Sequence, residues 1–273
     1  MFRTYYVTEA MRGVLRAASE LNMDILVHLT SKTMTSREIH IYLGNIYSCS
    51  GIIFAEILNN EKLLNAVINE KIPCIIMNSV DETLRTGCIT IDNRGGAIIA
   101  VDHLVSLGHR HIATITGDLS IQAGRERLEG YKEGLKKHGI PLNDDLVKRG
   151  DFSPISARKA AYEIIRAETY PTAIFVASDE MAQEVVRALT EKKIKVPQDI
   201  SVIGFDNSWF ATQGILGLTT VSQPITAMGE IAVKTLKKMM DLKRTAKFPR
   251  IVLSTELIKR ESCVSPLKRE DFY

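Results

Sequence analysis

Helical and strand-like hydrophobic periods alternate along nearly the whole of this 273-residue chain. Residues 7–21 carry apolar side chains every three to four positions, which is typical of an amphipathic helix, and the apolar run 23–29 that follows is typical of a strand. Repeated alternation of this kind indicates βαβ units around a parallel sheet, whose strands are buried on both faces. The chain is therefore predicted to adopt an α/β fold built on parallel sheets.

The remaining elements follow the same rhythm. Further helices are expected at residues 36–46, 58–69, 94–107, 124–138, 154–167, 179–192 and 225–240. Strands are expected at residues 50–55, 72–78, 88–91, 111–117, 172–178, 200–205, 218–221 and, from their alternation, 251–262. Asp92 is a candidate N-cap for the helix that follows it, and Gly108 is a candidate C-terminal cap of the same helix.

Asp206 directly follows the predicted strand 200–205. In open parallel sheets, ligands bind outside the carboxyl ends of the strands, so this carboxylate is a candidate ligand contact. The alternative is an ordinary turn with a solvated Asp206, because Asp and Asn are common turn formers. Pro224, which comes after the next strand, favours an extended Gln223, and this indicates a crossing between two bodies rather than a helix start.

The composition is that of an ordinary globular protein, with 45% hydrophobic and 25% charged residues. The formal net charge of +3 comes without a dense block of Lys and Arg, so the chain itself shows no nucleic-acid footprint. We find no signal peptide at the start and no apolar run long enough to cross a bilayer. We expect a cytoplasmic protein without a membrane partner.

The residues that could bind metal or form disulfides are scattered. The cysteines lack metal or disulfide spacing: Cys49, Cys74, Cys88 and Cys263. Cys74 and Cys88 lie in apolar, strand-like runs and are read as reduced thiols. Three histidines also fall on a helix, a cap and a strand start, which argues against a metal site: His103, His109 and His111. We find no phosphate loop, dinucleotide fingerprint or catalytic triad, so we expect no metal, no cofactor and no catalytic residue.

Several blocks of the chain carry a family resemblance. They include VPQDISVIGFDN, LTTVSQPITAMGEIAVKTL and STELIKRES, and they occupy residues 90–117, 125–135, 171–189, 196–207, 218–236 and 254–262. In order and spacing, the chain resembles the effector-binding core of the lac-repressor/galactose-repressor (LacI/GalR) family of bacterial transcription regulators. The resemblance implies a type I periplasmic-binding-protein-like fold, in which two Rossmann-like parallel-sheet lobes are joined by three crossing strands.

The resemblance also implies a domain organisation. We place the crossings near Asp92, Gln223 and Arg250. The amino-terminal lobe would comprise residues 1–91 plus 223–249 and the carboxyl-terminal lobe residues 92–222 plus 250–265, and the tail would be residues 266–273. The chain departs from the family pattern because the helix-turn-helix DNA-binding domain and the first strand of the amino-terminal lobe are not found in it. It would be a truncated product, or another element would fill that strand position.

Four candidate site residues of the carboxyl-terminal lobe are carried over from the resemblance. Arg127 matches the family's ligand-contacting arginine, and its planar fork suits paired hydroxyls or a carboxylate. Asp206 matches the carboxylate that accepts hydrogen bonds from sugar or ribose hydroxyls. Ser178 and Asp179 stand at the family's Asn-Asp pair, where the shorter serine would change the ligand contact. Asp179 is equally a candidate N-cap of its helix.

Four further candidates complete the expected ligand site. Phe152 occupies the family's aromatic position, where a flat ring covers the apolar face of a sugar. Gln223, at a crossing, and Asn78, at the end of an amino-lobe strand, are the remaining polar candidates. Tyr6 lies near the family's aromatic residue after the first strand. Trp209 is read as loop packing, with an aromatic wall of the site as the alternative.

These observations predict a ligand-sensing core rather than an enzyme. A small sugar-like effector would bind between the lobes, favour a closed arrangement and so alter a homodimer's fit to operator DNA. The DNA contact would be made only through the domain missing here, and the dimer seam would include the helix after residues 50–55 and the helix 225–240. The alternatives are a periplasmic-type sugar-binding protein of a transporter, which needs an export signal, and an α/β enzyme, which needs a catalytic base.

Overall fold

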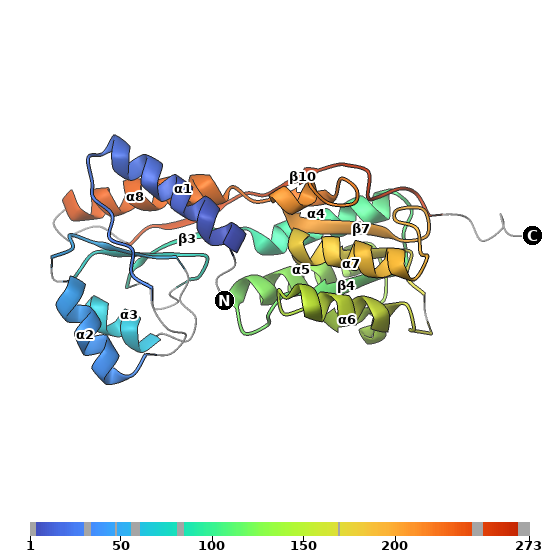
Figure 1. Cartoon of the computed structure of the whole chain (residues 1–273), viewed down its shortest axis with the longest axis horizontal. Coiled ribbons are helices and arrows are strands. Elements are labelled where there is room, and N and C mark those ends of the chain that lie inside the picture. The colour runs from blue at the N-terminus through green and yellow to red at the C-terminus, as the bar shows by residue number, and fades with distance from the viewer. Residues whose placement is uncertain are drawn as a thin grey trace, which may run out of the picture. The chain divides into compact units, whose positions relative to one another are not determined.

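The structure is a computed structural model that describes residues 4–29, 34–46, 48–55, 61–80, 85–168, 170–241 and 248–266. The chain forms two compact units (Figure 1). Unit 1 comprises residues 1–91 and 224–253, and unit 2 comprises residues 92–223 and 254–273. The divisions therefore fall one residue and four residues later than expected at the second and third crossings. Apart from residue 266, the predicted tail lies outside the described residues.

Unit 2 is built on a six-stranded sheet with the order β10-β8-β7-β6-β4-β5. Its strands are β4 (Ile112–Thr116), β5 (Val147–Arg149), β6 (Ala173–Val176), β7 (Ser201–Asp206), β8 (Thr219–Ser222) and β10 (Glu256–Ile258). All neighbouring strands are parallel except β10, which is antiparallel to β8. The carboxyl ends of β7 and β8 therefore meet at one edge of the sheet. The short edge strand β5 was not predicted.

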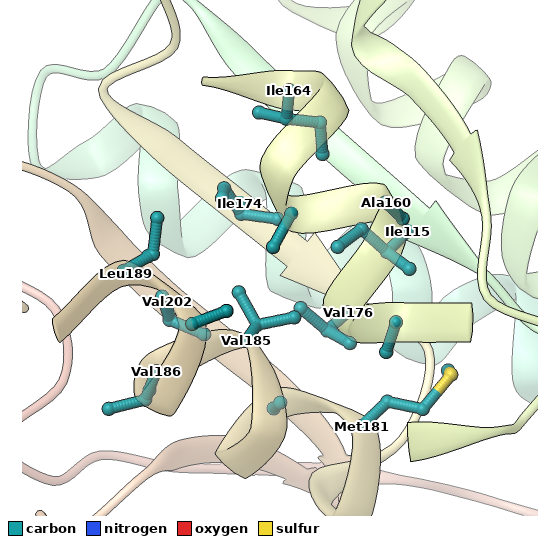
Figure 2. Close-up of a cluster of buried hydrophobic side chains, with 14 of the residues drawn as sticks. Ile115, Ala160, Ile164, Ile174, Val176, Met181, Val185, Val186, Leu189 and Val202 are labelled. Atoms are coloured by element: carbon teal, nitrogen blue, oxygen red, sulfur yellow. The ribbon is translucent and has the colours of Figure 1, made fainter. Parts of the chain in front are cut away.

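Helices cover both faces of this sheet (Figure 1). The helices are α4 (Asn93–Ser106), α5 (Gln122–Lys137), α6 (Pro154–Ile164) and α7 (Asp179–Glu191), with 3-10 turns η1 (Asp144–Leu146) and η2 (Trp209–Ala211). Figure 2 shows the core under α6 and α7, where Ile115, Val176 and Val202 of the strands meet Val185 and Met181 of α7. Burial of these side chains is the main force that holds this layer together.

Unit 1 has a smaller sheet of the same kind. Its four parallel strands have the order β1-β2-β3-β9 and span Ile52–Phe54, Cys74–Met77, Gly87–Ile91 and Arg250–Leu253. Helices α1 (Thr4–Glu20) and α8 (Ile225–Asp241) lie side by side on one face, and α2 (Ser36–Ile46) and α3 (Glu61–Asn69) pack on the other (Figure 1). The α/β prediction is confirmed, and residues 58–60 of the predicted helix 58–69 lie outside the described residues.

Two predicted strands differ from the structure. Residues 23–29 form no strand, because no described strand pairs with them, and Leu26 is 67% exposed. The run 251–262 is not one strand but two short ones, since β9 pairs with β3 in unit 1 and β10 pairs with β8 in unit 2. The alternating pattern was read correctly in both halves, but the chain passes from one sheet to the other at residues 254–255.

Helix ends show how individual residues set the boundaries. The Asp92 side chain accepts a hydrogen bond from the backbone N–H of Gly95 at 2.7 Å, which confirms it as the N-cap of α4. Gly108 follows the same helix with a φ of 103°, which confirms its predicted role. Pro224 lies next to a division between the units, and its carbonyl accepts from the N–H of Met228 in α8, the helix predicted at residues 225–240.

Candidate functional site

Arg127 of α5 is the centre of a polar cluster in unit 2, and only 3% of its side chain is exposed. Its Nε donates a hydrogen bond to Oδ1 of Asn93 at 2.9 Å, and its Nη1 donates to the carbonyl oxygen of Ala177 at 2.6 Å. Nη1 also lies 3.4 Å from Oδ1 of Asp206, an ion-pair distance. Because a buried guanidinium must find acceptors, these contacts fix the direction of the side chain.

Asp206 ends β7 and is the acidic member of the cluster. Its side chain is 16% exposed and accepts hydrogen bonds from Nη1 of Arg127 and from Nε2 of Gln223. Gln223 directly follows β8, and because β7 and β8 are parallel neighbours, both side chains come to the same edge of the sheet. The structure thus brings together three residues that the sequence analysis selected or placed near the crossing.

One acceptor of this cluster lacks a partner. Among the residues that the structure describes, Oε1 of Gln223 has no hydrogen-bond partner although the side chain is 8% exposed. A buried acceptor without a donor is unfavourable by about 1–3 kcal/mol, so this atom calls for a donor from water or a ligand. We name Arg127, Asn93, Asp206 and Gln223 together the Arg127 cluster.

Two aromatic rings flank the guanidinium. The Cζ atom of Arg127 lies 3.7 Å from the ring centroid of Phe205 and 5.7 Å from that of Phe152. Phe152 has a φ of 52°, and its ring packs on Gly117 so closely that a Cβ added there would lie 2.0 Å from Cζ of the ring. A glycine at position 117 is therefore required for this placement of Phe152, which is the aromatic residue predicted for the site.

Ser178 and Asp179 lie at the start of α7, and both side chains are buried. Ser178, not Asp179, is the N-cap of α7: its side chain accepts from the N–H of Met181. The prediction of Asp179 as the cap is therefore wrong. Asp179 is fully buried and accepts hydrogen bonds from Ser208 and Thr220. Burial raises its pKa to about 8, the Asp206 carboxylate acts in the same direction, and the hydrogen bonds oppose the rise.

The two candidates in unit 1 differ from each other. Asn78 follows β2 with a φ of 59°, is 5% exposed, and its Oδ1 has no hydrogen-bond partner among the described residues. Tyr6 of α1 lies in the core of unit 1, where its hydroxyl donates to the carbonyl oxygen of Ala55 at 3.2 Å. Asn78 thus has an unused acceptor, whereas the Tyr6 hydroxyl is already occupied within unit 1.

Sequence reasoning missed two members of this arrangement. Asn93, which directly precedes the predicted helix 94–107, was not selected, yet it bridges Arg127 and Glu126, to which its Nδ2 donates at 3.1 Å. Phe205 was read only as a strand residue, although it stacks on Arg127. A usable signal for Asn93 was its place directly after a strand, next to the cap residue Asp92.

The histidines His103 and His109, considered above for a metal site, are buried in unit 2. His109 is 1% exposed, and its ring nitrogens pair with the Thr172 hydroxyl and the Val264 carbonyl oxygen at 2.9 Å each. Burial lowers the pKa of His109 and that of His103. Within the described part of the chain, no group of three or more possible metal ligands gathers. None of the described helices combines the length and hydrophobicity that crossing a bilayer requires.

Comparison with known proteins defines the class. Residues 101–263 match the family described as "Periplasmic binding protein-like domain". The solved structure of a transcriptional regulator CelR–cellobiose complex matches with a TM-score of 0.85 at 30% identity, covering 94% of this chain and 79% of that chain. The two units, each built on a mainly parallel sheet, are thus those of a periplasmic-binding-protein-like core.

Two further relatives place this core among regulators. The HTH-type transcriptional regulator DegA of Bacillus subtilis (strain 168) is 32% identical over 262 residues, which are 95% of this chain and 77% of DegA. A LacI family transcriptional regulator from Mycobacterium smegmatis has a TM-score of 0.83 at 26% identity, with 96% of each chain covered. The chain belongs to the LacI/GalR family of transcriptional regulators, as their effector-binding core.

Proposed function

We propose that unit 2 binds a small, sugar-like effector through the Arg127 cluster. In this role, effector occupancy controls DNA binding by a helix-turn-helix domain, of which the described residues form no part. The observation that carries the proposal is the pairing of a buried arginine fork with the partly exposed carboxylate of Asp206, next to the unsatisfied Oε1 of Gln223.

The chemistry of the cluster favours a ligand that offers several hydroxyl donors. Asp206 lies 3.4 Å from Nη1 of Arg127, and a carboxylate has lone pairs for several donors. Oε1 of Gln223 needs one donor more. Vicinal hydroxyls satisfy two neighbouring acceptors at once, and their aliphatic side suits the flat ring of Phe152. A neutral polyhydroxylated molecule therefore fits this set of groups better than an acid, which Asp206 would repel.

Relatives support both parts of the proposal. CelR forms a complex with cellobiose, a sugar, and its chain is 30% identical to this one. DegA is an HTH-type transcriptional regulator. These relatives also support a binding role without catalysis, and they favour a regulator over a transport protein. By analogy with them, we propose that the protein acts in the cytoplasm, where its operator DNA lies.

A thermal-shift screen tests the ligand class. The protein is heated with cellobiose, ribose, sugar phosphates and nucleobases in separate samples, and any compound that raises Tm is tested again on Arg127→Ala and Asp206→Ala. A ligand present at about 100 times its Kd adds about 2.7 kcal/mol to the folded state, which gives a readily measured shift. We expect a sugar to raise Tm for the parent protein and neither variant to show the full shift.

Two control variants separate ligand binding from general loss of stability. Arg158→Ala removes another paired arginine of unit 2, which contacts Glu184 and Glu191 instead. Asp102→Ala removes a carboxylate that pairs with Lys137. Both controls should keep the full shift. A sugar that stabilises Asp206→Ala as much as the parent would refute the site, and a shift with nucleobases alone would refute the sugar class.

A further inference from the structure

The carboxylate of Asp179 joins Ser208, two residues after Asp206, to Thr220 of the neighbouring strand β8. Its Oδ2 accepts hydrogen bonds from the backbone N–H of Ser208 at 2.7 Å and from the Ser208 hydroxyl at 3.2 Å. Its Oδ1 accepts from the hydroxyl of Thr220 on β8 at 2.6 Å. Asp179 is 0% exposed, and these hydrogen bonds offset the free energy lost when its carboxyl group is removed from water.

The segment held by these bonds has an unusual backbone. Asp206 has a φ of 120° and Asn207 a φ of 57°, a region that residues with a side chain rarely adopt. Such residues are disfavoured by about 1–3 kcal/mol each and persist only where the surroundings hold them. We call Asp206, Asn207 and Ser208 the β7 turn, because Asp206 is the last residue of β7 and the other two follow it.

Neighbouring groups extend the hold of Asp179 on the β7 turn. The Thr220 hydroxyl that donates to Asp179 also accepts from the backbone N–H of Asn207, at 3.5 Å. The Asn207 side chain accepts from Nη2 of Arg260 at 2.7 Å. The backbone of Asn207 is thus linked to Asp179 through one hydroxyl, and that of Ser208 is linked to it directly.

Gly204 shows how closely the carboxylate fits against β7. A Cβ added at Gly204 would lie 2.3 Å from Oδ1 of Asp179, a separation that real contacts do not show. The φ of Gly204 is not in the positive range, so an alanine is compatible with the backbone there. The glycine therefore provides room for the Asp179 carboxylate rather than a special conformation.

We propose that Asp179 is a positioning residue: through Ser208 and Thr220 it holds the β7 turn in its disfavoured conformation and so directs the Asp206 carboxylate. It acts without touching the effector itself. This inference rests on the proposed function for the importance of Asp206 in binding. The conformation of the β7 turn itself can be tested in the protein without any ligand.

The experiment measures amide hydrogen exchange at Ser208 and the backbone couplings of Asp206 and Asn207 by NMR, in the ligand-free full chain. In Asp179→Ala we expect Ser208 to exchange about tenfold faster or more, relative to core amides of β6, because the hydrogen bond from its N–H to Oδ2 of Asp179 is lost. The couplings should shift away from positive φ. Asp179→Asn keeps one acceptor oxygen, so its changes in Ser208 exchange and in the couplings should be smaller than those of Asp179→Ala.

Two further variants make the result specific. In Gly204→Ala the added methyl group would displace the Asp179 carboxylate, so this variant should also speed amide exchange at Ser208. Ser178→Ala removes the cap of the same helix, and we expect it to lower overall stability without changing the couplings of the β7 turn.

Unchanged couplings and unchanged Ser208 exchange in Asp179→Asn or Gly204→Ala would overturn the proposal, even if Asp179→Ala failed to fold. So would a Ser178→Ala variant that alters the β7 turn as much as Asp179→Asn does, since the effect would then belong to the whole helix. Either failure would leave the proposed sugar site standing, because that site is tested by Tm shifts with ligand.

Discussion

A single glycine determines where the ring of Phe152 can lie. The α carbon of Gly117 is covered by the ring, and residues 151 and 152 have φ values of 51° and 52°. The local backbone is thus disfavoured, and the ring reaches the neighbourhood of Arg127 at 5.7 Å. The placement of Phe152 thus depends on the absence of a side chain at Gly117, and the rest of the site depends on its polar groups.

Gly117→Ala should therefore destabilise the protein. The added methyl group would lie 2.0 Å from Cζ of Phe152, so the ring must move, and overpacking of this kind lowers the free energy of unfolding by about 1–3 kcal/mol. Gly44→Ala on α2 is the control, because no atom lies within 4 Å of its added methyl group and alanine favours a helix. Urea denaturation measures both, and equal stability of Gly117→Ala and the parent would contradict this packing.

His109 should make stability depend on pH. Burial lowers its pKa in the folded protein, so the unfolded chain binds more protons once the pH falls below the ordinary value of 6.5. The stabilisation is present above that pH and is lost as the pH falls through the folded pKa. We expect the contribution of His109 to the free energy of unfolding to fall between pH 7.5 and 5.5. The parent protein should therefore lose stability relative to His109→Gln over this range, while the raised pKa of Asp179 acts in the opposite direction in both proteins.

Thr172→Val is the matched variant for this measurement. It removes the hydroxyl that pairs with Nδ1 of His109 but leaves the titrating ring in place. It should be less stable at every pH while keeping the pH dependence of the parent protein. His103, whose pKa is also lowered by burial, acts in the same direction as His109 and is present in both proteins. A parent protein and His109→Gln with parallel pH profiles would show that His109 is not the cause.

Much of the site could be anticipated from single residues, but their partners could not. Arg127, Asp206 and Gln223 were selected from family blocks and strand ends, and they meet in the structure. The hydrogen bonds from Ser208 and Thr220 to Asp179 join the start of α7 to the end of β7 and to β8, segments that are distant in sequence. No local pattern contains that information, so a helix cap was the natural reading of Asp179.

At the scale of elements, residues 23–29 show the limits of periodicity. Their apolar pattern predicts a strand, but a strand also needs a neighbour that pairs with its backbone. The structure leaves Leu26, Val27 and Leu29 more than half exposed. By contrast, residues 112–116 and 173–176 were found as strands because each has a partner in the sheet of unit 2. Pattern identifies a candidate strand, and pairing decides whether it forms.

Substitutions distinguish these two kinds of apolar segment. Leu26→Ser should change the free energy of unfolding by no more than about 0.5 kcal/mol, because its side chain is 67% exposed. Val185→Ala, in the core shown in Figure 2, should lower it by about 2 kcal/mol, because the residue is fully buried. Chemical denaturation followed by circular dichroism measures both. A loss for Leu26→Ser as large as that for Val185→Ala would mean that residues 23–29 are packed.

At the scale of the whole molecule, the chain has two units with separate hydrophobic cores. Each unit is a sheet with helices on both faces, and the alternating pattern predicted that architecture. The chain leaves one unit and returns to it, so contacts far apart in sequence, such as β3 with β9, decide the boundaries. For that reason the last crossing was misplaced by four residues, although its existence was anticipated.

We propose that the protein is a homodimer whose seam includes α3 and α8, as the family resemblance implies. Light scattering coupled to size-exclusion chromatography measures the mass in solution, and we expect twice the mass of one chain at micromolar concentration. A charge reversal on the exposed side of α8, Lys234→Glu, should weaken the dimer, and Lys132→Glu on α5 of unit 2 is the control. A monomer across this range would contradict the proposed assembly.

Isothermal titration calorimetry shows directly whether Asp206 is the acceptor for a polyhydroxylated effector. The sugar with the largest thermal shift is titrated into the parent protein, Asp206→Asn and the control Asp102→Asn. We predict a Kd at least about tenfold weaker for Asp206→Asn, as expected for loss of a charged hydrogen-bond acceptor, and an unchanged Kd for the control. The same Kd for the parent protein and Asp206→Asn would contradict the claim.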